Sequence, residues 1–197
     1  MPRCKNSCGV TRIAPDEPQG QRGLTLVELV VVMAIFSILA VTGLSWAGTA
    51  IKGIQIQFAT RMLFSAVVQA RNEAVVRNMR VVLCKSSTGQ GCSFAGGWDQ
   101  GWMIFGDANN NAARDSNEPI LFVQKRLAGT VRIMGNAAVS NYVSYTGQGN
   151  SKSTTGGFQA GTITLCDLTD ISAQARKIVI TSTGKPHVET ATFAECL

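Results

Sequence analysis

The hydrophobic positions of the chain begin with one nearly uninterrupted apolar run. It covers residues 24–47 and contains Glu28 as its one charged residue. At about 1.5 Å of rise per residue, a helix of this length is long enough to cross a hydrocarbon core of about 30 Å. The run therefore predicts a membrane-spanning helix.

Between residues 52 and 79 the apolar residues recur instead at helical spacing. One predicted face holds Phe58, Ala59, Met62, Leu63, Ala66, Val67, Ala70 and Ala74, and the opposite face holds Arg61, Ser65, Gln69, Asn72 and Glu73. This pattern predicts an amphipathic helix with one face packed on a globular domain. Gly43, Gly48 and Gly53 precede it at intervals of five residues; they either loosen the helix or allow close contacts between membrane helices.

The remainder of the chain consists of short β-prone runs separated by Gly, Asn and Ser. These runs are residues 80–84, 101–105, 119–123, 130–134, 142–145, 162–165, 177–181 and 187–192. Their spacing is typical of an antiparallel β domain. The predicted fold class is therefore α+β, with a long N-terminal α-helix packed on an antiparallel β-sandwich-like head.

Charge predicts the orientation of the apolar run. Four cations, Arg3, Lys5, Arg12 and Arg22, precede the run, and the first cations after it are Lys52 and Arg61. The positive-inside rule then keeps the N-terminus in the cytoplasm and exports the head. A cleaved secretory signal has a shorter apolar core, of about 7–15 residues, so this run does not fit one.

Glu28 requires an explanation because an acidic residue within a membrane costs about 2.5–3.5 kcal/mol on insertion scales. A buried carboxylate is tolerated when it is paired, and an amine is a suitable partner. Cleavage after Gly23 would supply one, since it would leave Leu24 as a new N-terminus with Glu28 as the fifth residue. The alternative is a signal anchor that keeps its leader and never polymerises.

The segment Gly23-Leu24-Thr25-Leu26-Val27-Glu28 resembles the class III signal of type IV pilins and type II secretion pseudopilins. It departs from that pattern in a long leader and in Leu24, where Phe is usual. The resemblance implies cleavage after Gly23 by a prepilin peptidase, N-methylation of Leu24, and pairing of Glu28 with the amine of a neighbouring subunit. The implied organisation is a leader at 1–23, a transmembrane or filament-core helix at 24–50, an amphipathic helix at 51–79 and a pilin head at 80–197.

Within this class, the head resembles the GspH/FimT/FimU group. The resemblance rests on residues 69–74, on 101–105 leading into 107–111, and on 178–184. It implies a minor type IV pilin that lies in the inner membrane with a periplasmic head and then joins other major and minor pilins in a pilus. The alternative is a minor pseudopilin of a type II secretion system.

The cysteines fall into two groups. Cys4 and Cys8 lie in the leader, and Cys84, Cys92, Cys166 and Cys196 lie in the exported part, where disulfides form. Four cysteines allow three pairings. We favour Cys84 with Cys92, around a Gly-rich turn, and Cys166 with Cys196, at the C-terminus. Zinc is the alternative, but no Cys-x-x-Cys spacing occurs here.

Cations near the C-terminus form a candidate DNA-binding site. Its members are Arg176, Lys177, Lys185 and His187, with Arg132 expected on a neighbouring strand. Without the leader's four cations and two anions, 14 basic and 10 acidic residues remain, a net charge of +4 that permits contact with a polyanion. DNA-binding FimT-like pilins carry a Gly-Arg-x-Arg motif, which Gly184-Lys185-Pro186-His187 matches in part. The resemblance therefore implies double-stranded DNA as a partner, for uptake in natural transformation.

Two other sets of residues carry weaker signals. Asp107, Asn109, Asn111, Asp115 and Glu118 follow a calcium-loop spacing. Because Ala112 replaces the Gly of the sharp turn, a hairpin loop with left-handed Asn residues is favoured, and no metal or cofactor is assigned. The second set is aromatic and is expected mainly in the core: Trp98, Trp102, Tyr142, Tyr145 and Phe158.

The sequence does not favour an enzyme. His187 is the one histidine, and no Ser nucleophile lies in a Gly-x-Ser-x-Gly turn. The exported cysteines are expected to be paired, so they offer no free thiolate. Binding and assembly are the functions that the sequence predicts.

Overall fold

The computed structural model describes residues 25–167, 169 and 175–196, without the side chains of 41–52 and 193. The elements are α1 (Leu26–Arg77), β1 (Val81–Lys85), η1 (Trp98–Gln100), β2 (Gly101–Gly106), β3 (Ile120–Lys125), β4 (Val131–Gly135), η2 (Ala137–Val139), β5 (Tyr142–Tyr145), β6 (Gly161–Asp167), β7 (Ala175–Ile180), β8 (Pro186–Ala191) and η3 (Phe193–Cys196). Contacts divide the chain into two compact units, Met1–Gly43 and Leu44–Leu197.

The described part of the first unit is the beginning of α1. The helix is capped by Thr25, whose Oγ1 accepts a hydrogen bond from the N–H of Glu28 at 3.3 Å. Thr-x-x-Glu is a capping-box sequence, and the Glu28 carboxylate in the first turn suits the positive end of the helix dipole. Within the described residues, no helix has the length and hydropathy required to cross a membrane. The predicted span of residues 24–47 includes residue 24, and also 41–47, which are described without side chains.

In the second unit, α1 packs on the sheets with one face. The buried residues of this face are Ile56, Ala59, Leu63, Ala66, Val67, Ala70 and Ala74. Their spacing of three and four confirms the predicted amphipathic helix. Phe58 was wrongly placed on the buried face: it is 59% exposed, because it lies about 200° around the helix from Ile56. The helix ends at Arg77, where Asn78 adopts a left-handed conformation (φ 48°) and Met79 N–H bonds to Ala74 C=O at 3.2 Å, as in a Schellman motif.

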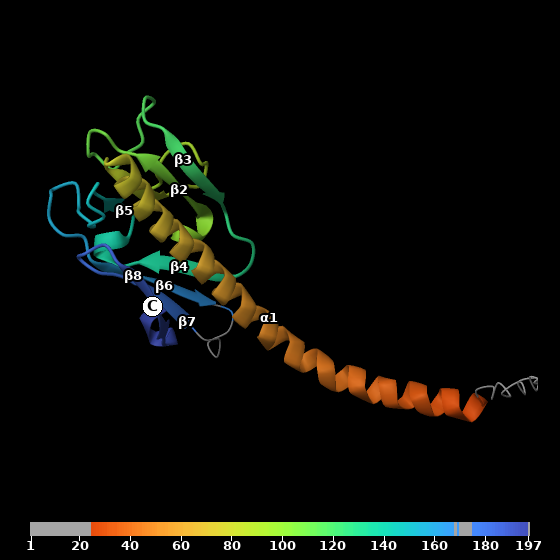
Figure 1. Cartoon of the computed structure of the whole chain (residues 1–197). Coiled ribbons are helices and arrows are strands. Elements are labelled where there is room, and N and C mark those ends of the chain that lie inside the picture. The colour runs from red at the N-terminus through yellow and green to blue at the C-terminus, as the bar shows by residue number, and fades with distance from the viewer. Residues whose placement is uncertain (1–24, 168, 170–174, 197) are drawn as a thin grey trace, which may run out of the picture. The chain divides into compact units, whose positions relative to one another are not determined.

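The head contains two four-stranded antiparallel sheets (Figure 1). Their strand orders are β3-β2-β1-β5 and β4-β6-β7-β8. All eight predicted strands are present, with ends that differ from the predicted ones by at most two residues. The fold is therefore the predicted α+β arrangement of a helix and an antiparallel β-sandwich-like head.

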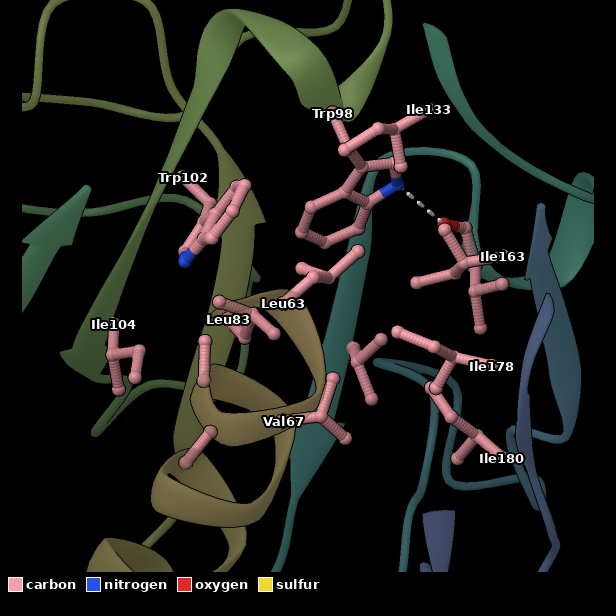
Figure 2. Close-up of a cluster of buried hydrophobic side chains, with 14 of the residues drawn as sticks. Leu63, Val67, Leu83, Trp98, Trp102, Ile104, Ile133, Ile163, Ile178 and Ile180 are labelled. Atoms are coloured by element: carbon pink, nitrogen blue, oxygen red, sulfur yellow. Dashed lines mark hydrogen bonds between the residues drawn. The ribbon is translucent and has the colours of Figure 1, made fainter. Parts of the chain in front are cut away.

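The helix and both sheets share one core. Figure 2 shows Leu63 and Val67 of α1 among the side chains of both sheets, including Ile104 of β2 and Ile178 of β7. Trp98 is fully buried, and its indole N–H donates to the C=O of Val139 at 3.1 Å. Of the other predicted core aromatics, Trp102 and Tyr145 are buried and Tyr142 is half-buried, whereas Phe158 is 70% exposed.

Two disulfides have the pairing that the sequence favoured. Cys84 pairs with Cys92, next to a second buried cluster on the other face of the first sheet, which includes Val82 and Met103. Cys166 of β6 pairs with Cys196 of η3. The second disulfide closes the longer loop and ties the C-terminal turn to the second sheet.

Candidate functional site

The first candidate site is the start of α1. Gly23 and Leu24, the predicted cleavage and methylation residues, lie outside the described residues. Glu28 is exposed, and its carboxylate has no ion-pair partner within the part of the chain that the structure describes. The sequence argument missed Thr25, although the Thr-x-x-Glu spacing is visible in the sequence.

Apolar side chains surround this carboxylate on α1 and are exposed as well. They include Leu26 (80%), Leu29, Val30, Met33 and Phe36 (68%). Isolated exposed apolar residues are ordinary on proteins, but a contiguous set indicates an interaction surface. Within the described residues, the site thus combines an exposed apolar helix surface with one acid that has no ion-pair partner.

The predicted DNA-binding cluster is divided between two faces of the second sheet. Neighbouring residues of a strand point to opposite faces, so Arg176 and Lys177 of β7 diverge. Arg176 lies on the face of Ile178 and Ile180, towards the core, and Lys177 lies on the outer face. This alternation is readable from the sequence, and the prediction of one cluster ignored it.

On the outer face, acidic residues neutralise the predicted cations. Lys177 Nζ lies 3.4 Å from a Glu189 carboxylate oxygen and 3.1 Å from a Glu195 oxygen. His187 Nε2 lies 3.0 Å from the other Glu189 oxygen. The hydrogen bonds from His187 and Lys177 lower the pKa of Glu189, and the Thr192 N–H and Lys177 lower that of Glu195. Glu195 raises the pKa of Lys177. Two carboxylates therefore offset the charge that was expected to bind phosphate.

The other predicted residues of the cluster form no ion pair with this group within the described residues. Gly184 and Lys185 form the β7–β8 turn, where Gly184 has φ +77° and packs against the backbone of Gly149 and Ser151. Lys185 is exposed, with no ion pair among the described residues. Arg132 was expected on a strand next to the other cations, but its strand, β4, pairs with β6 and lies at the opposite edge of the sheet from β8. Its side chain and that of Glu195 line a common pocket beside the Cys166–Cys196 disulfide.

Arg176 lines a groove between α1 and β8 that the sequence did not reveal. The groove has a volume of about 270 Å³ and is lined by Gln57, Thr60, Arg61, Phe64, Arg176 and Val188. Within the described residues, neither arginine forms an ion pair or a side-chain hydrogen bond. Two arginines therefore share an apolar groove without a carboxylate partner.

The acidic loop between β2 and β3 is organised by its own backbone. Asp107 and Glu118 are buried: Asp107 accepts N–H bonds from Asn111 and Ala112, and Glu118 accepts N–H bonds from Ala108 and Asp115. Burial raises the pKa of Asp107, and these N–H groups oppose that shift. Among the described residues, no group of three His, Cys, Asp or Glu side chains is arranged to hold a metal ion.

The left-handed residues of this loop are Asn110 (φ 59°) and Ala112 (φ 55°). A left-handed Asn was expected of a hairpin loop, whereas Ala seldom adopts this conformation. The bonds that Asp107 accepts stabilise it. The loop is thus a capped turn in which the carboxylates satisfy backbone donors.

Two family models match parts of the sequence. Residues 59–184 match the family described as type II transport protein GspH, and residues 18–44 match the prokaryotic N-terminal methylation motif. No curated protein matches the sequence.

Solved structures of two proteins resemble the chain. The type IV minor pilin FimU of Pseudomonas aeruginosa strain PAO1, in space group P65, has a TM-score of 0.50 and 18% identity, covering 68% of this chain and 91% of that one. Its P21 form has a TM-score of 0.49 and 19% identity, covering 68% and 87%. The minor pseudopilin EpsH of the Vibrio cholerae type 2 secretion system has a TM-score of 0.47 and 6% identity, covering 69% and 97%. The FimU likeness indicates a shared fold.

Proposed function

The chain belongs to the GspH family of type II transport proteins, and from this we propose that it is a minor type IV pilin that enters a filament through the first part of α1. The family consists of structural pilins and pseudopilins, and its methylation motif implies anchoring in the inner membrane before assembly. In the proposal, prepilin peptidase cleaves after Gly23, Leu24 is methylated, and the subunit then joins other pilins.

One observation carries the proposal. The apolar side chains at the start of α1 are exposed around the Glu28 carboxylate, which has no ion-pair partner in the part of the chain that the structure describes. In a filament core, neighbouring helices would cover these side chains, and the new N-terminal amine of a neighbour would pair with Glu28. Without that amine, the buried charge would cost several kcal/mol, so the pairing would also fix the axial position of the subunit.

Glu28→Gln tests this role because it removes the charge and keeps the shape of the side chain. The matched control is Glu73→Gln, the same substitution in the same helix, where Glu73 pairs with Arg77 at the surface. We expect Glu28→Gln to be processed and to fold but to be missing from sheared filaments, and Glu73→Gln to be incorporated as in the wild type. Normal incorporation of Glu28→Gln would contradict the proposal.

The family description favours a second candidate, a minor pseudopilin of a type II secretion system. Both candidates use the same helix, so Glu28→Gln does not separate them. Deletion of the gene does: loss of surface pili with normal export of folded enzymes supports the pilin, and the reverse result supports the pseudopilin.

Binding of duplex DNA stays a prediction. The arrangement of charges narrows the expected phosphate contact to one exposed lysine. Lys177 and His187 are paired with acids, so Lys185 is the exposed cation of the predicted site without such a partner among the described residues. One or two phosphate contacts would give weak binding with a log–log salt slope of about −1 to −2. Fluorescence anisotropy with a labelled duplex measures this slope, and Lys185→Ala should abolish the binding. Binding unchanged by Lys185→Ala would exclude this residue as the contact.

A further inference from the structure

The groove between α1 and β8 has features of a binding site that the proposed helix assembly does not use. We propose that it binds an extended acidic segment of another filament subunit, which adds to β8 as a further strand and places carboxylates on Arg61 and Arg176. That the segment comes from another subunit rests on the proposed function. Its acidic, extended character rests on the groove itself.

Strand β8 has an open edge. The sheet order places β8 last, next to β7. At the turn, Thr181 N–H bonds to Lys185 C=O at 3.2 Å, which makes these two residues a hydrogen-bonded pair. Antiparallel pairs alternate, so Val179–His187 and Lys177–Glu189 are hydrogen-bonded as well, while the N–H and C=O groups of Val188 and Thr190 point away from β7.

The position of Pro186 agrees with this alternation. Pro186 belongs to the same outward set as Val188 and Thr190, so its missing N–H removes no bond to β7. The backbone groups of Val188 and Thr190 have no hydrogen-bond partner within the described chain. They are therefore available to an added strand.

The groove is positively charged. Arg61 comes from α1 and is exposed, and Arg176 comes from β7 and is half-buried. Both guanidinium groups line the groove without a carboxylate among the described residues. A guanidinium binds a carboxylate through two parallel hydrogen bonds, which gives both affinity and orientation. An acidic ligand is thus the one that the groove complements.

The shape of the groove favours a peptide over DNA. The groove also contains Phe64 and Val188, and Val188 is 39% exposed although it lies on the core side of its strand. A volume of about 270 Å³ accommodates a few side chains, which on an added strand would be alternate residues of the segment. Arg176 and Val188 lie on the same face of the sheet, so the side chains on that face of the added strand would pass Val188 and reach the arginines. An extended segment of alternating acidic and apolar residues meets this requirement, because all of its acidic side chains point to one face.

The test uses the full chain in detergent micelles and a labelled peptide, acetyl-Val-Glu-Val-Glu-Val-Glu-amide, with the corresponding lysine peptide as control. We expect saturable binding of the acidic peptide alone. Arg61→Gln and Arg176→Gln should each weaken it about tenfold, the loss of one charge-assisted contact. Arg132→Gln, at the other edge of the same sheet, should have no effect. Thr190→Pro should also weaken binding, because it removes an outward N–H and leaves the β7–β8 ladder intact.

Three results would overturn the proposal: no binding of the acidic peptide, binding that is insensitive to both arginine substitutions, or a labelled DNA duplex bound through these arginines in place of the peptide. Thermal unfolding checks that each variant is folded, and if Thr190→Pro is not, the arginine variants decide. In cells, Arg61→Glu with Arg176→Glu should reduce incorporation into filaments, and full incorporation would contradict a subunit partner. Normal incorporation of Glu28→Gln, in contrast, would refute the helix proposal and leave the peptide result standing.

Discussion

The two parts of α1 carry similar apolar side chains but differ in how exposed these side chains are. Between Leu26 and Leu39 these side chains are exposed, whereas Ile56, Leu63 and Val67 are at most 1% exposed. The helix is regular in both parts, so helix formation does not explain the difference. The difference is the surface opposite the helix: the second part faces two sheets of its own chain.

The comparison shows that an apolar pattern indicates which helix face has to be buried but does not determine which surface buries it. The head meets that need internally, through one core shared by α1 and both sheets (Figure 2). Among the described residues, the first part of α1 has no such core around it. This agrees with the proposed role, in which membrane lipid and then neighbouring subunits cover the helix.

The largest effect is expected from the same substitution at both ends of α1. Leu63→Ala should destabilise the head by about 3–5 kcal/mol, because it leaves a cavity in a closely packed core. Leu29→Ala removes the same atoms from an exposed side chain and should leave the unfolding of the head unchanged. Thermal unfolding of the full chain in micelles, followed by tryptophan fluorescence, measures both. Equal destabilisation would mean that the two parts do not differ as described.

The two disulfides of the head should differ in how much they stabilise it, since cross-links stabilise mainly by restricting the unfolded chain. Cys166 and Cys196 are 30 residues apart and Cys84 and Cys92 are 8 apart. Loop-closure entropy then gives a stabilisation of the folded state of about 3.7 kcal/mol for the first disulfide and about 2.6 kcal/mol for the second. We expect Cys166→Ser with Cys196→Ser to lower the denaturation midpoint more than Cys84→Ser with Cys92→Ser. The reverse order would indicate that packing around Cys84 outweighs loop length.

Two glycines allow the cost of losing a tertiary contact to be distinguished from the cost of an unfavourable backbone conformation. Gly184 and Gly156 both have a positive φ, +77° and +85°, but a Cβ on Gly184 would meet Gly149 O, and one on Gly156 would have nothing within 4 Å. Gly156→Ala should cost about 1 kcal/mol from conformation alone, and Gly184→Ala about 2–3 kcal/mol. Chemical denaturation of each variant gives both values. Equal costs would show that the contact of the β7–β8 turn with Gly149 contributes nothing.

The smallest effect concerns pH at the C-terminal turn. The pKa of Glu195 is lowered in the folded chain by the Thr192 N–H and by Lys177, so its ionised form stabilises the turn above the unfolded pKa. This contribution is lost as the pH falls below the ordinary pKa of a glutamate, about 4.3, and through the lower folded pKa. Hydrogen exchange of residues 192–196 should therefore accelerate on acidification, and Glu195→Gln should remove most of this pH dependence. The same pH dependence in Glu195→Gln would assign it to another group.

The sequence by itself determined the elements. Short β-prone runs separated by Gly, Asn and Ser located all eight strands, helical spacing located the buried seam of α1, and Gly23 to Glu28 indicated the pilin class. These features are local, because hydrophobic periodicity and short motifs depend on neighbouring residues. Phe58 is the exception: it fits the apolar composition of the helix but lies away from the seam that the sheets select.

The tertiary structure decided which charges meet. It paired Lys177 with Glu189 and Glu195, and it placed Arg132 at the far edge of the sheet. Strand order and the fold of the C-terminal turn fix these distances, and neither follows from local pattern. The groove that joins Arg61 to Arg176 brings together residues far apart in the sequence. Such a site exists only once the helix is docked on the sheet, because Coulomb and hydrogen-bond energies depend on distances in space, which spacing along the chain does not set.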